Sequence, residues 1–113
     1  MIIMIFNNLM NSQKYVKQTD FFKTMLEAWL LRTRKIINKE QTITASDGKK
    51  YVKIRLYEPG CYVEDFCYID KANGNVLKPQ GWGGVAPGVR GNIFAGWDGV
   101  DKNGAIKFNK TYD

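Results

Sequence analysis

Within the run from Lys49 to Glu58, aliphatic residues alternate with polar or aromatic residues from Tyr51 to Tyr57, and this alternation constrains the fold more than any other feature. Successive side chains of a strand point to opposite faces, so the pattern predicts a strand with one buried face. The buried face takes three aliphatic residues, Val52, Ile54 and Leu56. The other face combines rings and cations, Tyr51, Lys53, Arg55 and Tyr57. Asp47-Gly48 precedes this strand and predicts a hairpin with the stretch Gln41–Ala45.

Further turn signals divide the rest of the chain into short strands. Glu58-Pro59-Gly60 ends the first long strand, and residues 61–70 predict the second. Simple alternation places Cys61, Val63, Cys67 and Ile69 on one face of it and Tyr62, Phe66 and Tyr68 on the other. A glycine-containing turn over 70–74 leads into a strand over 75–78. Edge strands are predicted over 93–95 and 105–109, around a turn at 98–104.

An apolar stripe with helical spacing follows Thr19 and Asp20, either of which can cap a helix. Its members are Phe22, Met25, Leu26, Trp29 and Leu30, with Ile36 or Ile37 as an extension. The stripe predicts an amphipathic helix of about 18–20 residues that covers the aliphatic face of the sheet. The predicted fold class is therefore α+β, with one amphipathic helix packed on an antiparallel β-meander of four to five strands. The 113 residues suit a single domain, 1–113, in which residues 1–17 form an extended or flexible arm.

The chain is basic, with 17 Lys and Arg against 11 Asp and Glu and a net charge of +6. The excess is spread over the whole sequence, which favours a polyanionic partner such as nucleic acid or acidic protein. A basic composition is equally a common property of small proteins. Four cations gather near the end of the predicted helix, Arg32, Arg34, Lys35 and Lys39. They complement the helix dipole or form part of a phosphate-contacting surface.

The chain contains no histidine, and this removes several classes of catalytic and metal site. Ser-His-Asp and Cys-His nucleophiles and His-ligated metals are excluded, and no paired carboxylates replace them. We therefore expect no enzymatic activity, no metal and no cofactor. Cys61 and Cys67 are too far apart along one strand for a disulfide, so both are predicted to be buried, reduced thiols. The spacing of Asp98, Asp101 and Asn103 does not fit a calcium loop and indicates turns.

The segment KPQGWGGVAPGVRGNI, residues 78–93, holds five glycines and two prolines and lacks hydrophobic periodicity. This composition predicts a glycine-rich loop over 79–92 rather than a helix or a regular strand. Four of its side chains, Lys78, Trp82, Arg90 and Asn92, are candidates to hold an anion or a base. The spacing matches neither a phosphate loop nor a dinucleotide-binding loop. Trp82 capping the open end of the sheet is the structural alternative.

The candidate nucleic-acid-binding residues combine the polar sheet face with this loop. They are Tyr51, Lys53, Arg55, Tyr57, Phe66, Tyr68, Lys78, Trp82, Arg90 and Asn92. Aromatic rings stack on the bases of a single strand while cations follow its backbone. Glu64 and Asp65 bring opposing charge to the same region. A homodimer or protein-partner interface, or ordinary cross-strand packing, would use the same rings.

The apolar run MIIMIFNNLM at residues 1–10 is too short to span a membrane and lacks the features of a signal peptide. Ile2, Ile3, Ile5 and Phe6 suit insertion into the groove or sheet edge of a protein partner. The alternative function is therefore a virion structural protein or a protein that interacts with a host protein, using this arm and the aromatic face. No membrane association is expected.

The pattern YIDKANGNVLKPQGWGGVAPGVRGNI at residues 68–93 resembles a group of short bacteriophage proteins of no assigned function. The shared positions are Asp70, Lys71, Gly74, Lys78, Pro79, Trp82, Arg90, Gly91, Asn92 and Ile93. The segment between Trp82 and Arg90 departs from the group, in which it is rich in Lys and Ala. The resemblance covers about a quarter of the chain and implies a viral origin, with the host cytoplasm or the virion as location.

Overall fold

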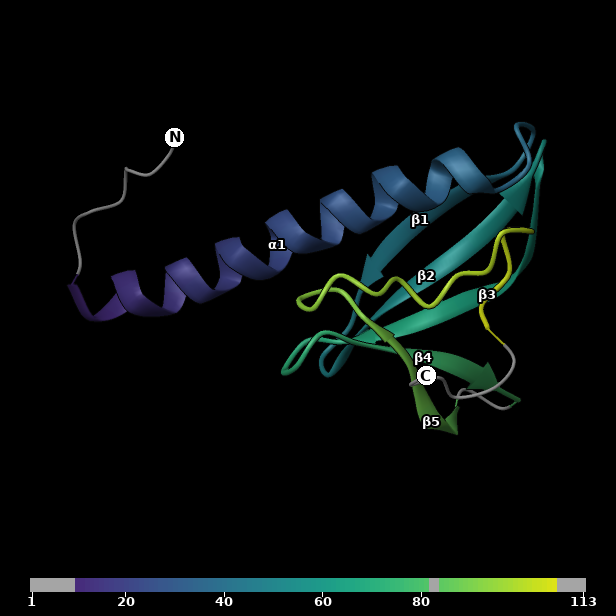
Figure 1. The fold of residues 1–113 in the computed structure, drawn as a ribbon. Coiled ribbons are helices and arrows are strands. Elements are labelled where there is room, and N and C mark those ends of the chain that lie inside the picture. Colours follow the sequence, from purple (N-terminus) through teal and green to yellow (C-terminus); the bar gives the residue numbers. More distant parts are fainter. Residues whose placement is uncertain (1–9, 82–83, 108–113) are drawn as a thin grey trace.

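The computed structural model describes residues 10–81 and 84–107, which form one helix and one antiparallel sheet (Figure 1). The helix is α1 (Met10–Ile36), and the strands are β1 (Thr42–Asp47), β2 (Tyr51–Glu58), β3 (Cys61–Asp70), β4 (Asn75–Gln80) and β5 (Gly84–Asn92). Their order in the sheet is β1-β2-β3-β4-β5, so every strand pairs with its neighbour in sequence. The α+β class with one helix on a β-meander is confirmed.

The helix is longer than its apolar stripe predicts. It begins at Met10 rather than near Asp20 and has 27 residues. Residues 10–17, predicted as part of an extended arm, are therefore helical. Figure 1 shows the N-terminal part of α1 extending past the sheet, while its C-terminal part lies along one sheet face. The stripe identified the part of the helix that packs, because apolar periodicity reports burial rather than helix length.

The core lies between the second half of α1 and the aliphatic face of the sheet. Trp29, Ile43, Ile54, Ile69 and Val76 are completely enclosed. The predicted faces of β2 are confirmed, since residues 52, 54 and 56 are buried and their polar neighbours are only half-buried. Burying a large apolar side chain contributes about 1.5–3 kcal/mol, so this layer is the main stabilising feature.

Two irregularities in β3 change which of its side chains share a face. Its register with β2 shifts between the pairs Ile54–Cys67 and Arg55–Asp65, and again between Leu56–Glu64 and Tyr57–Tyr62. Each shift leaves one residue of β3 unpaired, as in a β-bulge. Phe66 is the first extra residue, and it lies on the core side with its ring 6.4 Å from that of Trp29. Its predicted place beside Tyr68 is wrong.

The second extra residue, Val63, restores the original alternation. Tyr62 and Tyr68 therefore still share a face, as predicted. Cys61 and Val63 are exposed rather than buried with Cys67 and Ile69, because this end of β3 lies outside the packed layer. The prediction of two buried thiols is therefore confirmed for Cys67 and wrong for Cys61.

The glycine-rich segment forms most of strand β5, so the prediction of a loop over 79–92 is wrong. The strand tolerates Pro87 because its ladder with β4 is interrupted there. Leu77 pairs with Val89 and Pro79 with Val85, which leaves two more residues on β5 than on β4. Gly88 adopts a φ of 97° in this bulge. Glycine and proline are thus placed where a strand can accommodate them.

The segment that follows β5 packs on the same side of the sheet as α1. Trp29 Nε1 donates a hydrogen bond to Asp98 O at 2.8 Å, and Arg32 forms a bidentate pair with the Asp98 carboxylate. Residues 93–95 and 105–107 form turns, a bend and an isolated bridge rather than the predicted edge strands, and residues 108–109 of the second predicted strand lie outside the described residues. The Asp101 carboxylate accepts hydrogen bonds from Asn103 N and Ala105 N, which confirms a turn.

Candidate nucleic-acid interface

The face of β1–β3 that points away from α1 carries most of the predicted binding residues. Cross-strand register sets three rows on it: Thr44, Arg55 and Asp65; Ser46, Lys53 and Tyr68; and Thr42, Tyr57 and Tyr62. Tyr51 and Asp70 lie opposite each other at the end of the sheet near the first hairpin. Directly opposed residues of an antiparallel pair share a face, so these side chains form one continuous surface. We call it the tyrosine–cation face.

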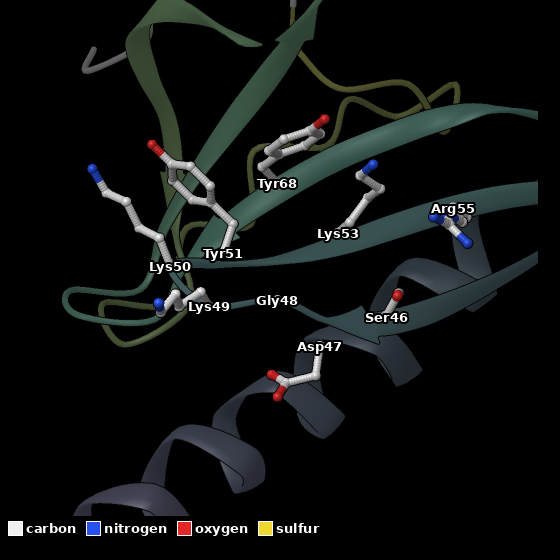
Figure 2. Close-up of a pocket in the computed structure, with 9 residues that line it drawn as sticks. All are labelled: Ser46, Asp47, Gly48, Lys49, Lys50, Tyr51, Lys53, Arg55 and Tyr68. Carbon is white, nitrogen blue, oxygen red and sulfur yellow. The ribbon is translucent and has the colours of Figure 1, made fainter. Parts of the chain in front are cut away.

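A shallow hollow of about 310 Å³ lies at the hairpin end of the tyrosine–cation face. Figure 2 shows Tyr51, Tyr68 and Lys53 on the same side of the sheet, with Lys50 beside Tyr51. Four cations line the hollow, namely Lys49, Lys50, Lys53 and Arg55, against the single carboxylate Asp47.

The Asp47 carboxylate does not neutralise this hollow. In Figure 2 it points away from the tyrosines, toward the side of the helix. Its Oδ1 is 2.8 Å from Lys71 Nζ, and that ammonium also donates to Gly48 O. The carboxylate is thus already paired, and the hollow keeps its positive potential.

Two pairs of tyrosines stand at the two ends of β2. The ring centroids of Tyr51 and Tyr68 are 5.6 Å apart, and those of Tyr57 and Tyr62 are 5.7 Å apart, both in edge-to-face geometry. Tyr51 and Tyr57 are six positions apart along β2, a distance of about 20 Å. Edge-to-face packing holds each ring in one orientation and leaves part of its surface for a ligand.

The members of each pair differ in exposure. Tyr68 is only 5% exposed and Tyr62 is 51% exposed, while Tyr51 and Tyr57 are half-buried. Tyr68 is therefore too enclosed to stack on a base itself, and it supports Tyr51 instead. Lys50 and Lys53 add to this support, with Nζ atoms 5.3 Å from the Tyr51 ring centroid and 5.6 Å from that of Tyr68.

Arg55 lies midway between the two tyrosine pairs. Within residues 10–81 and 84–107 its guanidinium forms no hydrogen bond and no ion pair. A guanidinium presents five N–H donors in a planar fork that matches a phosphate. Arg55 is thus the cation of this face whose donors are most available to an anion.

Two of the predicted binding residues, Phe66 and Arg90, are buried and are therefore not available to a ligand. Phe66 packs in the core and is 5% exposed. Arg90 is also 5% exposed, and its guanidinium donates to three backbone carbonyls, those of Pro87, Gly88 and Lys107. A buried guanidinium whose donors are already used stabilises the bulge of β5 and the segment beside it. It has no room for a phosphate.

The remaining candidates of the glycine-rich segment lie outside β1–β3, and Lys78 borders the tyrosine–cation face at Asp65. The Asn92 amide donates to Asn73 O and Asn75 Oδ1, and its carbonyl accepts from Phe94 N and Ala95 N, so its polar atoms organise turns. Lys78 is half-buried beside Glu64, Asp65 and Pro79. Trp82 lies outside the described residues, as does the apolar stretch 1–9.

The cations of α1 are also used in the fold. The hydrogen bond to Asp98 raises the pKa of Arg32, and the pair ties the helix to the C-terminal segment. Arg34 Nη2 donates a hydrogen bond to Ile43 O at 3.1 Å, which ties the end of α1 to β1. These contacts differ from both interpretations of the cations, since Arg32 and Arg34 bind groups of other elements rather than only complementing the helix dipole.

Sequence reasoning missed Lys49 and Lys50 as part of the hollow and Asp65 as part of the face. The two lysines sit in the hairpin turn, and turn residues show no alternation that would assign them a face. Asp65 reaches the face only through the bulge at Phe66. The sequence shows two acidic residues, Glu64 and Asp65, between Tyr62 and Phe66. It does not show on which side of the sheet each carboxylate lies.

Two other groups among the described residues bear on reactivity and on metal binding, namely the Cys67 thiol and the acidic side chains. Burial raises the pKa of the Cys67 thiol well above its usual value, so the thiol remains protonated and unreactive near neutral pH. Among the described residues, no three His, Cys, Asp or Glu side chains lie together in a way that could hold a metal. No helix in this part of the chain is long and apolar enough to cross a membrane.

No protein-family model matches the chain, and no curated protein or solved structure is similar enough to count as a relative.

Proposed function

We propose that the protein is a non-enzymatic nucleic-acid-binding protein that holds a single strand along the tyrosine–cation face. The observation that carries this proposal is the alternation, on the face of the sheet that points away from α1, of a tyrosine pair, two cations and a second tyrosine pair. A single strand offers the same alternation of flat bases and anionic phosphates. A duplex would hide the faces of its bases from such rings.

Each side chain has a distinct role in this proposal. Tyr51, backed by Tyr68, stacks on one base, and the Tyr57–Tyr62 pair stacks on another, each contact contributing about 1–3 kcal/mol. Lys53 and Arg55 contact the phosphates between them. The lysines of the hairpin, Lys49 and Lys50, extend the positive surface past Tyr51.

The proposal includes the bacteriophage origin suggested by residues 68–93, with action in the host cytoplasm. A homodimer would place two tyrosine–cation faces on one longer strand and increase the avidity for it. The alternative of a virion or host-interacting protein depends on Ile2, Ile3, Ile5 and Phe6, which lie outside the described residues.

The test is a fluorescence-anisotropy titration with labelled oligothymidylate, oligouridylate and a DNA duplex of equal length at two salt concentrations. We expect both single strands to bind more tightly than the duplex, with an affinity that falls steeply with salt. Tyr57→Ala and Tyr51→Ala should each weaken single-strand binding about tenfold or more. Absence of binding at low salt would remove the proposal, and affinity capture with the full chain would then test for a protein partner.

A further inference from the structure

The tyrosine–cation face includes two carboxylates, Asp65 and Asp70, and Asp65 is the one that lies between the two tyrosine pairs. Asp65 lies directly opposite Arg55 in the register of β2 and β3. Along β3 it falls between Tyr62 and Tyr68, which belong to the two tyrosine pairs. It therefore occupies the part of the face where a strand stacked on both pairs would place its backbone.

Both oxygens of Asp65 contact donors of the face. Tyr62 donates its hydroxyl proton to Oδ1 at 2.6 Å, and Lys53 Nζ lies 3.8 Å from Oδ2. The hydrogen bond also raises the pKa of Tyr62, so this hydroxyl keeps its proton and remains a donor. A carboxylate and a phosphodiester are both anions whose oxygens accept from the same N–H and O–H groups.

We propose that Asp65 is an internal substitute for a phosphate of the bound strand, and that the strand must displace it from Lys53 and Tyr62. This rests on the proposed function of the face. The ligand class is a single-stranded nucleic acid that places one phosphodiester between two stacked bases. Asp65 thereby lowers the affinity for such strands and keeps Lys53 and Tyr62 oriented when none is bound.

The contacts of Asp65 suit a partner that can be displaced. The Lys53–Asp65 pair is long for an ion pair, and both side chains are partly exposed, at 34% and 26%. An exposed pair of this kind is weak, because solvent and salt screen the attraction between its charges. Arg55, directly across the strand, does not pair with Asp65, so its donors do not have to be released first.

The experiment compares Asp65→Asn with Glu64→Gln in the full chain. Both substitutions remove one negative charge from neighbouring positions, but Glu64 is exposed opposite Leu56, on the helix side of the sheet. The probe is fluorescein-labelled twelve-residue oligothymidylate, titrated between about 0.05 and 0.3 M salt. Thermal unfolding of each variant verifies the fold, and Asp65→Ser serves as a second variant at the same position.

We expect Asp65→Asn to bind the probe about five- to tenfold more tightly than the wild type at low salt, because a like charge is removed near the phosphate. Its log–log salt slope should steepen by about 0.7, the contribution of one added phosphate contact on a single strand. Glu64→Gln should change affinity less than about twofold and leave the slope unchanged, since the contacts of Lys53 and Tyr62 are with Asp65 and Glu64 faces the helix side. In a Lys53→Gln background, Asp65→Asn should lose most of its effect.

The outcomes separate the two proposals. Wild-type binding with equal effects of Asp65→Asn and Glu64→Gln would overturn the role of Asp65 and keep the proposed function. Binding that appears only in the Asp65 variants would support the displacement role in its strongest form. Failure of the wild type and of every Asp65 variant to bind would overturn both.

Discussion

Thr33 is the residue whose environment departs most from what its chemistry requires. Its side chain is completely buried in α1, and its hydroxyl has no hydrogen-bond partner among the described residues. A buried polar group without a partner costs about 1–3 kcal/mol. Valine has nearly the same shape without the hydroxyl, so it removes this cost without opening a cavity.

We expect Thr33→Val to raise the free energy of unfolding by about 1 kcal/mol. Thr24→Val is the matched control, because Thr24 is exposed on the same helix and its hydroxyl is accessible to water. Urea denaturation of the two variants and the wild type measures both effects. A loss of stability in Thr33→Val that Thr24→Val does not show would mean that the hydroxyl is satisfied in solution.

The buried Cys67 thiol makes the free energy of unfolding depend on pH in the alkaline range. Burial raises its pKa well above 9.0 in the folded state, while in the unfolded chain the thiol ionises near its ordinary pKa. The unfolded state therefore loses this proton first as the pH rises, and stability decreases above about pH 9 by at most about 1.4 kcal/mol per unit. The contribution of the protonated thiol is fully present below that pH.

The measurement is urea denaturation of wild type and Cys67→Ala at pH 8 and pH 10. We expect the wild type to lose more stability between these values than the variant, whose absolute stability is lower at both. Cys61→Ala retains Cys67 and should follow the wild type. Equal pH effects in Cys67→Ala and wild type would show that the thiol does not ionise on unfolding.

Among the elements, β5 depends most on the absence of side-chain atoms. A Cβ on Gly91 would lie 2.5 Å from Trp97 O, 2.6 Å from Gly99 N and 2.7 Å from the carbonyl carbon of Asp98. All three are backbone atoms of the segment that crosses β5, so no side-chain rotation relieves the contact. The strand and this segment can pack together only if residue 91 has no side chain.

We expect Gly91→Ala to lower the free energy of unfolding by about 3 kcal/mol. Gly81→Ala is the control, since its Cβ would meet no atom within 4 Å. Thermal unfolding of both variants gives the comparison. A Gly91→Ala variant as stable as Gly81→Ala would mean that the segment around Asp98 is not packed against β5.

The elements also show how far the sequence could predict this structure. The alternation of β2 and the Trp29 stripe gave the correct faces, because burial alone determines both patterns. The bulge at Phe66 and the strand at 84–92 were not predictable in this way, because glycine and proline permit a turn and a bulged strand alike. Cross-strand pairing decides between them, and it is a property of the partner strand.

The same distinction applies to the candidate site. Residues whose position follows from alternation along one strand were placed correctly, and residues whose position depends on strand pairing were not. Tyr51, Lys53, Arg55 and Tyr57 lie on one strand, so simple alternation placed them together correctly. Phe66, Arg90 and Asn92 depended on pairing or on the path of a glycine-rich segment, and all three have structural roles. Their residue types were suitable for binding, but side-chain chemistry does not report which carbonyls or rings lie nearby.

For the whole molecule, the net charge of +6 and the arrangement of the charges predict different effects of removing one cation on the binding of a polyanion. If overall charge alone attracts a polyanion, any lost cation has the same effect. If the tyrosine–cation face binds the strand, the position of the lost cation decides the effect.

Arg55→Gln and Lys35→Gln distinguish these cases, since each lowers the net charge by one. Lys35 is exposed on α1, away from the tyrosine–cation face. We expect Arg55→Gln to weaken oligothymidylate binding about tenfold and to reduce the salt slope by about 0.7, and Lys35→Gln to change neither appreciably. Anisotropy titrations over a salt series measure both quantities. Equal losses in the two variants would assign the binding to overall charge.

The hydrogen bond from Trp29 to Asp98 joins residues 69 positions apart, and this separation has a consequence for synthesis on the ribosome. The meander can form hairpin by hairpin as the chain emerges, since each strand pairs with its predecessor. The helix, made earlier, must wait for the segment that completes its packing. At about 5–20 residues per second, the apolar side of the nascent helix remains incompletely covered for roughly 3–14 s. During that interval the growing chain exposes apolar surface of the kind that chaperones generally bind.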